Sequence, residues 1–144
     1  MNSKWDKRFL ELAEHVAQWS KDPSTKVGCV IANTMKQVVS VGYNGFPRGV
    51  EDTPERLNDR ETKYRLVVHS EPNAIANANS SVRGCTAYTW PFGPCVECMK
   101  VLATNGITRV VHPALSDELR ERWGDSLQHA ADLAKEVGIQ LVEL

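Results

Sequence analysis

The chain has 144 residues, of which 42% are hydrophobic and 24% charged, and its formal net charge is −1. This length suits a single domain, residues 1–144, that buries roughly 70% of its unfolded surface in one core. The composition shows no apolar run near the ~20 residues of a membrane span, and residues 1–5 lack a signal-peptide core, so we expect a cytoplasmic protein without a membrane association. The near-neutral charge argues against a polynucleotide partner and favours a small ligand.

Hydrophobic periodicity and turn residues predict strands and helices that together form one mixed sheet. A helical apolar pattern opens the chain and ends at Asp22-Pro23-Ser24, and two runs rich in β-branched residues then form an antiparallel hairpin. In chain order we expect helix 5–19, strands 27–32 and 38–43, an exposed loop over 42–49, a short helix over 56–64, helix 72–78, strand 84–90, helix 95–104, strand 108–112, helix 117–137 and strand 139–144. These elements indicate an α/β protein with a five-stranded mixed sheet flanked by helices.

The stretch that carries chemistry is His69-Ser70-Glu71, which Pro72 follows directly. Proline is tolerated only in the first turn of a helix, so Pro72 places this stretch at a helix start. The imidazole is a candidate metal ligand. Glu71 is a candidate acid-base group that moves the protons of a metal-activated water.

Two of the four cysteines, Cys95 and Cys98, offer the remaining metal ligands. On a helix this spacing turns both sulfurs to one side, and the helix start favours the thiolate form. With His69 they predict a zinc site whose fourth position is open, which is typical of catalytic zinc. A structural zinc half-site or a redox pair is the alternative. We expect Cys29 and Cys85, in predicted strands, to be core thiols.

A histidine, one residue and a glutamate, followed later by Pro-Cys-x-x-Cys, form the signature of zinc deaminases. Together with the segment Asp22 to Gly28, the loop 42–49 and the continuation Pro72 to Ile75, the chain resembles the cytidine deaminase superfamily and most closely the deoxycytidylate (dCMP) deaminases. The resemblance runs from Asp22 to about Val111. It implies a three-layer fold, one catalytic zinc ion and hydrolysis of dCMP to dUMP and ammonia, a step that feeds thymidylate synthesis.

The resemblance also assigns roles to individual residues. Glu71 would take a proton from the activated water, deliver it to the cytosine ring nitrogen and then protonate the departing amine. The residues implied in substrate binding are Asn44 at the sugar, the backbone of Ser70 at the pyrimidine edge, and Ser24, Thr25 and Lys26 at the 5′-phosphate. The alternatives are a turn residue for Asn44 and an ordinary exposed lysine for Lys26.

Members of this family are often homo-oligomers, hexamers or dimers, under allosteric control by deoxynucleoside triphosphates. The glycine-rich loop takes part in that control, so the resemblance implies an effector site for a magnesium-bound triphosphate. Its residues would be Gly42, Tyr43, Gly45 and Arg48. Arg48 is also a second phosphate candidate, or a solvated loop residue.

The chain departs from the family pattern beside the base. The loop from Thr89 to Pro94 looks two residues longer than usual, so dCTP or a 5-substituted dCMP stays an alternative substrate. Trp90 or Phe92 is expected to wall the base, because aromatic faces stack on nucleobases, and core packing is the alternative for Trp90. A tRNA or nucleic-acid adenosine deaminase and a non-catalytic zinc-stabilised module are the other functional alternatives.

Overall fold

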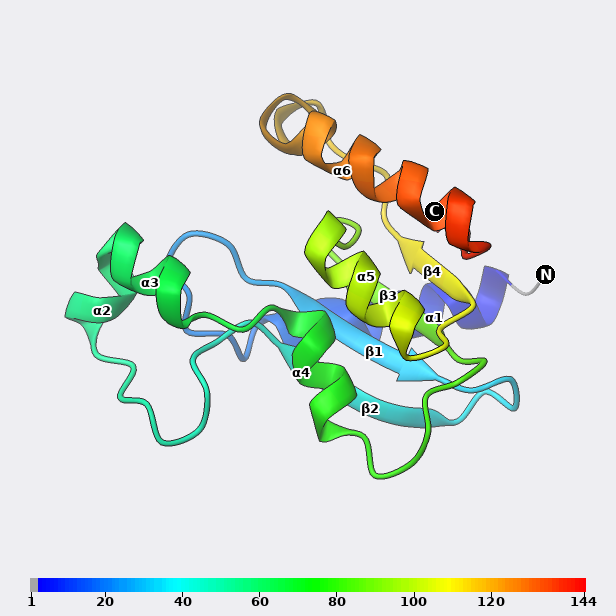
Figure 1. Cartoon of the computed structure of the whole chain (residues 1–144), viewed down its shortest axis with the longest axis horizontal. Coiled ribbons are helices and arrows are strands. Elements are labelled where there is room, and N and C mark those ends of the chain that lie inside the picture. Colours follow the sequence, from blue (N-terminus) through cyan, green and yellow to red (C-terminus); the bar gives the residue numbers. More distant parts are fainter. Residues whose placement is uncertain (1–2) are drawn as a thin grey trace.

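The computed structural model describes residues 3–144, so the first two residues of the N-terminal segment considered above lie outside the described residues. Figure 1 shows a central sheet with helices on both faces. The elements are α1 (Ser3–Ala17), β1 (Gly28–Ala32), β2 (Val38–Tyr43), α2 (Pro54–Asn58), α3 (Arg60–Leu66), α4 (Ser70–Asn77), β3 (Thr86–Trp90), α5 (Val96–Thr104), β4 (Arg109–His112), α6 (Asp117–Val137) and β5 (Gln140–Glu143).

The sheet has five strands in the order β2-β1-β3-β4-β5. Strand β1 is antiparallel to both β2 and β3, whereas β3, β4 and β5 are mutually parallel. Parallel neighbours need crossover connections, which α5 and α6 provide. The predicted hairpin and the mixed sheet flanked by helices are confirmed. None of the helices within residues 3–144 is both long and apolar enough to cross a membrane.

The prediction of one helix over 56–64 is wrong, because the structure has two, α2 and α3, on either side of Asp59. The Thr53 side chain caps the start of α2, and Pro54 occupies its first turn. Asp59 has extended backbone angles (φ −89°, ψ 107°), which end α2 and begin α3. Aspartate disfavours helix interiors because its side chain competes for backbone hydrogen bonds. Here the Asp59 carboxylate accepts a hydrogen bond from the Thr62 hydroxyl.

Two apolar clusters fill the spaces on the two faces of the sheet. One cluster lies between the sheet and helices α4, α5 and α6, and it contains Cys29 and Cys85 as buried free thiols. The other lies between the sheet and α1, around Phe9 and Tyr88. The prediction that Cys29 and Cys85 are core residues is therefore confirmed.

Helix α4 packs closely on β2 because a glycine stands at the crossing. A Cβ atom on Gly42 would lie 2.3 Å from the backbone nitrogen of Ala74 and 2.6 Å from the carbonyl oxygen of Ser70. Two asparagines of α4, Asn73 and Asn77, donate side-chain hydrogen bonds of 2.8 and 2.9 Å to carbonyl groups of β2. These contacts fix the start of α4, where His69 and Glu71 lie, relative to the sheet.

Candidate active site

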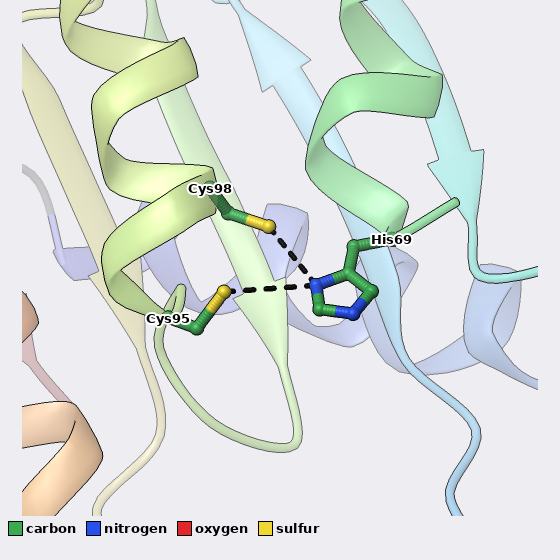
Figure 2. Close-up of side chains that lie close together, drawn as sticks. All are labelled: His69, Cys95 and Cys98. Carbon is green, nitrogen blue, oxygen red and sulfur yellow. Dashed lines mark hydrogen bonds between the residues drawn. The ribbon is translucent and has the colours of Figure 1, made fainter. Parts of the chain in front are cut away.

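Three metal-ligating side chains meet at the starts of α4 and α5. His69 is the N-cap residue of α4, Cys95 is the N-cap residue of α5, and Cys98 lies in the first turn of α5. Figure 2 shows the His69 ring turned with Nδ1 toward both sulfurs. Nδ1 is 3.1 Å from the Cys98 sulfur and 3.6 Å from the Cys95 sulfur. One ligand atom from each residue lies within 4.8 Å of the others.

This cluster fits a zinc ion. Zn–N bonds of about 2.0 Å and Zn–S bonds of about 2.3 Å at tetrahedral angles place nitrogen and sulfur roughly 3.5 Å apart. The two nitrogen–sulfur distances, 3.6 and 3.1 Å, bracket that value. One imidazole and two thiolates are the donors that zinc prefers. Three protein ligands leave a fourth position for water or substrate.

The two thiols differ in acidity. Hydrogen bonds from Cys98 and His69 lower the pKa of Cys95 to about 4, against the opposing effect of burial. The hydrogen bond to Cys95 and burial instead raise the pKa of Cys98. The hydrogen bond with Cys95 also raises the pKa of His69. The hydrogen bonds to Cys95 thus favour its thiolate form, which a metal requires.

Glu71 lies in the first turn of α4 and is 3% exposed. Burial raises the pKa of its carboxyl group above the ordinary value. The Ser70 hydroxyl, which is also buried, donates a hydrogen bond of 3.0 Å to Oε1 of Glu71. A carboxyl group whose pKa is shifted toward neutrality can both accept and return a proton near pH 7.

A cleft of about 660 Å³ opens beside these residues, a volume that suits a small molecule such as a nucleotide. Its walls are formed by the segment after α1, Asn44 after β2, helices α2 and α3, the start of α4, the loop before α5, and α6. The residues that line the cleft include Asp22, Ser24, Thr25, Asn44, Arg60, Lys63, Tyr64, His69, Ser70, Glu71, Phe92, Cys95, Arg122 and Trp123.

Two arginines that line the cleft have no carboxylate within ion-pair distance in the part of the chain that the structure describes. Lys63 forms a buried ion pair of 3.2 Å with Asp22. None of the ion pairs within residues 3–144 includes Arg60 or Arg122, whose guanidinium groups instead lie 5.2 and 5.3 Å from the rings of Tyr64 and Trp123. An anionic ligand would be attracted to such a site.

Of the residues expected at the sugar and the phosphate, some line the cleft and one does not. Ser24 and Thr25 line the cleft, whereas Lys26 is exposed and does not line it. Asn44 lines the cleft, but its side chain already accepts a hydrogen bond from the Val27 amide and donates one to the Thr25 carbonyl, both 2.9 Å long. These hydrogen bonds hold the backbone of the 22–27 segment in place. A contact of Asn44 with the sugar stays a prediction.

Trp90 does not reach the cleft. Side chains alternate along a strand, so Trp90 faces the same side of β3 as Tyr88. There it packs against the cluster beneath α1 and lines a different hollow, with Leu10 and Lys7 of that helix. Phe92, two residues farther along, lines the cleft instead. The structure thus places Trp90 at the cluster beneath α1 and not in the cleft, and a contact of Trp90 with the substrate stays a prediction.

The four residues expected at an effector site do come together. Gly42, Tyr43, Gly45 and Arg48 line a second hollow of about 340 Å³ that shares Asn44 and Lys63 with the wall of the first. The ligand of this hollow stays a prediction.

The contributions of α3 and α6 to the cleft were not predicted from the sequence. For the segment that contains Arg60 and Lys63 the sequence predicted only a short helix, and α6 carried no motif. The one available signal was Trp123, a large aromatic residue within a strongly charged helix.

The known proteins to which this chain is similar are deaminases. Residues 3–114 match the family model of the cytidine and deoxycytidylate deaminase zinc-binding region. A deaminase encoded in the luxG 3′ region of Aliivibrio fischeri is 40% identical over 144 residues, covering 100% of this chain and 96% of that protein. Deoxycytidylate deaminase of Mus musculus is 45% identical over 114 residues, covering 75% of this chain and 64% of that protein. The dCMP deaminase of cyanophage S-TIM5, solved with dCMP and dUMP, superposes with a TM-score of 0.76 at 20% identity, covering 100% of this chain and 99% of that one.

Proposed function

The chain belongs to the family of cytidine and deoxycytidylate deaminases, and we propose that it hydrolyses dCMP to dUMP and ammonia with one zinc ion. One observation carries the proposal: the His69, Cys95 and Cys98 cluster and the buried Glu71 open into a single cleft that also holds unpaired arginines. Relatives named as deoxycytidylate deaminases, and a solved one that holds dCMP and dUMP, support the choice of substrate.

The residues of the site divide the chemistry between them. His69, Cys95 and Cys98 would hold the zinc ion, which would supply a Lewis acid that brings the pKa of water toward neutrality. Glu71 is the proton carrier. Because Ser70 holds Oε1, we assign the mobile proton to Oε2. Glu71 accepts one proton from the attacking water and passes it to the pyrimidine ring nitrogen. It then takes the remaining proton from the hydroxyl group newly bonded to the ring carbon and delivers it to the amine as the carbon–nitrogen bond breaks, so that water and cytosine become uracil and ammonia.

The charge of the cleft supports a phosphorylated substrate over a free nucleoside. Arg60 and Arg122 have no carboxylate partner among the described residues, and the Lys63–Asp22 pair is neutral as a unit. The guanidinium group suits two-point recognition of phosphate. A nucleoside would leave these charges without an anion.

The test is a substrate survey with zinc-loaded protein. Ammonia release would be followed for dCMP, CMP, dCTP, 5-methyl-dCMP, deoxycytidine and a tRNA anticodon stem-loop. We expect the largest kcat/KM on dCMP. Turnover of the free nucleoside alone, of the tRNA alone, or of none of these would contradict the proposal. A preference for dCTP or 5-methyl-dCMP would keep the chemistry and replace the substrate.

The family also supports proposals about assembly, location and control. We propose a cytoplasmic homo-oligomer, a dimer or a hexamer, in which a magnesium-bound deoxynucleoside triphosphate binds the second hollow around Arg48. Light scattering would give the oligomeric state. Titration with dCTP or dTTP plus magnesium should shift the dCMP saturation curve, and an unchanged curve for both would contradict the effector site.

A further inference from the structure

Helix α6 forms one wall of the cleft although it begins at Asp117, beyond the residues 3–114 that match the family model. Arg122, Trp123, Ser126 and Leu127 of this helix line the cleft together with His69, Glu71 and Cys95. Figure 1 shows α6 on the same side of the sheet as α5, whose start carries the two cysteine ligands. One wall of the cleft is therefore contributed by the C-terminal part of the chain, outside the region that the family model matches.

A chain of contacts joins the metal-ligand loop to a cation on α6. Phe92 precedes the ligand Cys95 by three residues, and its ring centroid lies 5.9 Å from that of Trp123 at an interplanar angle of 44°. The guanidinium carbon of Arg122 lies 5.3 Å from the centroid of the Trp123 ring. Phe92, Trp123 and Arg122 thus form a row of contacts that begins in the loop before Cys95.

Two donors in this group lack partners. The indole Nε1 of Trp123 is covered and has no hydrogen-bond acceptor in the part of the chain that the structure describes. Unpaired buried donors are uncommon and mark places where a water or ligand atom completes the structure. Arg122 has no carboxylate partner within residues 3–144. Its guanidinium is held beside an aromatic ring, so less side-chain entropy is lost when it binds an anion.

We infer that Arg122 and Trp123 form a substrate-recognition pair, in which Trp123 with Phe92 stacks on the pyrimidine ring and Arg122 binds the 5′-phosphate. The inference rests on the proposed function and adds the residues that distinguish a nucleotide from a nucleoside. Neither Lys26 nor Arg48, the lysine and arginine that the sequence suggested, lines this cleft. Stacking on an aromatic face tolerates different bases, whereas the arginine recognises the phosphate by charged hydrogen bonds.

The first experiment compares R122Q with R120Q by steady-state kinetics on dCMP and deoxycytidine. Arg120 is the matched control, because it is an exposed arginine on the same helix that does not line the cleft. Loss of a charged hydrogen-bond partner should raise the KM for dCMP about 10- to 100-fold in R122Q, with kcat nearly unchanged. The kcat/KM for deoxycytidine should stay within about twofold of wild type, as should both substrates in R120Q.

A third variant, R60Q, tests the competing arginine on α3. If the KM for dCMP rises in R60Q and not in R122Q, the phosphate lies at α3 and the inference is overturned. Equal behaviour of R122Q and R120Q overturns it as well. Failure of the wild-type protein to deaminate dCMP would instead overturn the proposed function, so the two failures are distinguishable.

The second experiment tests the aromatic half of the pair with W123A and W123F. Binding of dUMP would be measured by calorimetry, and zinc content and thermal unfolding would verify an intact fold. W123A should weaken dUMP and deoxyuridine binding alike, by about 5- to 100-fold, whereas W123F should retain most of the affinity. Unchanged dUMP affinity in W123A, or equal loss in W123F and W123A, would overturn the stacking role.

Discussion

Glu71 and Glu97 are two carboxylates at equivalent sequence distances from metal ligands, but in opposite surroundings. Glu71 stands two residues after His69 and is buried, whereas Glu97 stands two residues after Cys95, is exposed and pairs with Lys100. Only Glu71 lines the cleft. The comparison separates an acid-base group from a carboxylate that merely accompanies a helix start.

We therefore predict that E71Q lowers kcat on dCMP by about 10²- to 10⁴-fold, the usual range for loss of a general acid-base group. Zinc content should stay at the wild-type level, because Glu71 is not a ligand. E97Q, the matched control, should stay within about twofold of wild type. Zinc analysis and steady-state kinetics on the three proteins provide the check, and loss of zinc from E71Q would mean that this carboxylate is a ligand.

The ion pair between Asp6 of α1 and Arg109 of β4 ties this helix to the sheet. Asp6 is almost fully buried and accepts hydrogen bonds of 2.7 and 2.6 Å from Arg109 and 2.9 Å from the Tyr88 hydroxyl. D6N leaves the Arg109 charge without its partner, which should reduce the free energy of unfolding by about 3 kcal/mol. Urea denaturation at pH 7 would measure this loss. D52N, which breaks the exposed pair with Lys21, should change stability little.

The same pair has a signed pH dependence. The hydrogen bond from Arg109 lowers the pKa of Asp6 in the folded protein. The carboxylate therefore stabilises the fold fully above its unfolded pKa of about 3.9, and this contribution is lost as the pH falls through the lower folded value. Below about pH 4, stability should therefore fall more steeply in wild type than in D6N as the pH is lowered. Parallel curves would show that Asp6 does not titrate with folding.

Among single residues, the metal ligands and the proton carrier could be predicted because their types and spacing are dictated by zinc chemistry. Trp90 and Trp123 could not be ranked in the same way. Which tryptophan meets the cleft depends on the face of β3 that Trp90 occupies and on where α6 lies in space. Neither of these can be determined from the local sequence.

At the scale of elements, the crossing of α4 and β2 is set by a single glycine. We predict that G42A destabilises the protein by about 1 to 3 kcal/mol and weakens zinc binding, because the added Cβ would displace the backbone that carries His69. G45A is the matched control, since a Cβ there meets nothing within 4 Å. Urea denaturation and competition with a chelator would measure both effects. Equal stability of the two variants would contradict this account of the crossing.

Most elements could be predicted because hydrophobic period and capping agree. Helix α6 begins and ends as expected, with a Ser116 side-chain cap and Gly138 in the left-handed conformation (φ 84°). The α2–α3 break was missed because a balanced charged segment has no apolar period to mark its helices. Its division depends on the backbone at Asp59, which only the folded chain displays.

At the scale of the whole molecule, the alternation of strands and helices predicted one mixed sheet, but not the cleft. Its walls combine the 22–27 segment, α3, the loop before α5, and α6, which lie up to about a hundred residues apart in sequence. Such a site is a product of strand order and helix placement. The gathering of Arg60 and Arg122 at the cleft could not be predicted from the net charge of −1, because that value is a sum over the whole chain.

The last prediction follows from where the metal cluster sits relative to the core. Neither apolar cluster contains His69, Cys95 or Cys98, and a chain of this size buries roughly 70% of its unfolded surface without help from a metal. Dialysis against a chelator should therefore abolish deamination while far-UV circular dichroism at 25 °C stays native, unlike zinc fingers, which unfold without metal. Because zinc binds only the folded chain, its removal should lower the melting temperature by about 5 to 15 °C. Stoichiometric zinc should restore both activity and melting temperature, and a chelated protein that is unfolded at 25 °C would show that the metal, rather than the two clusters, holds the fold together.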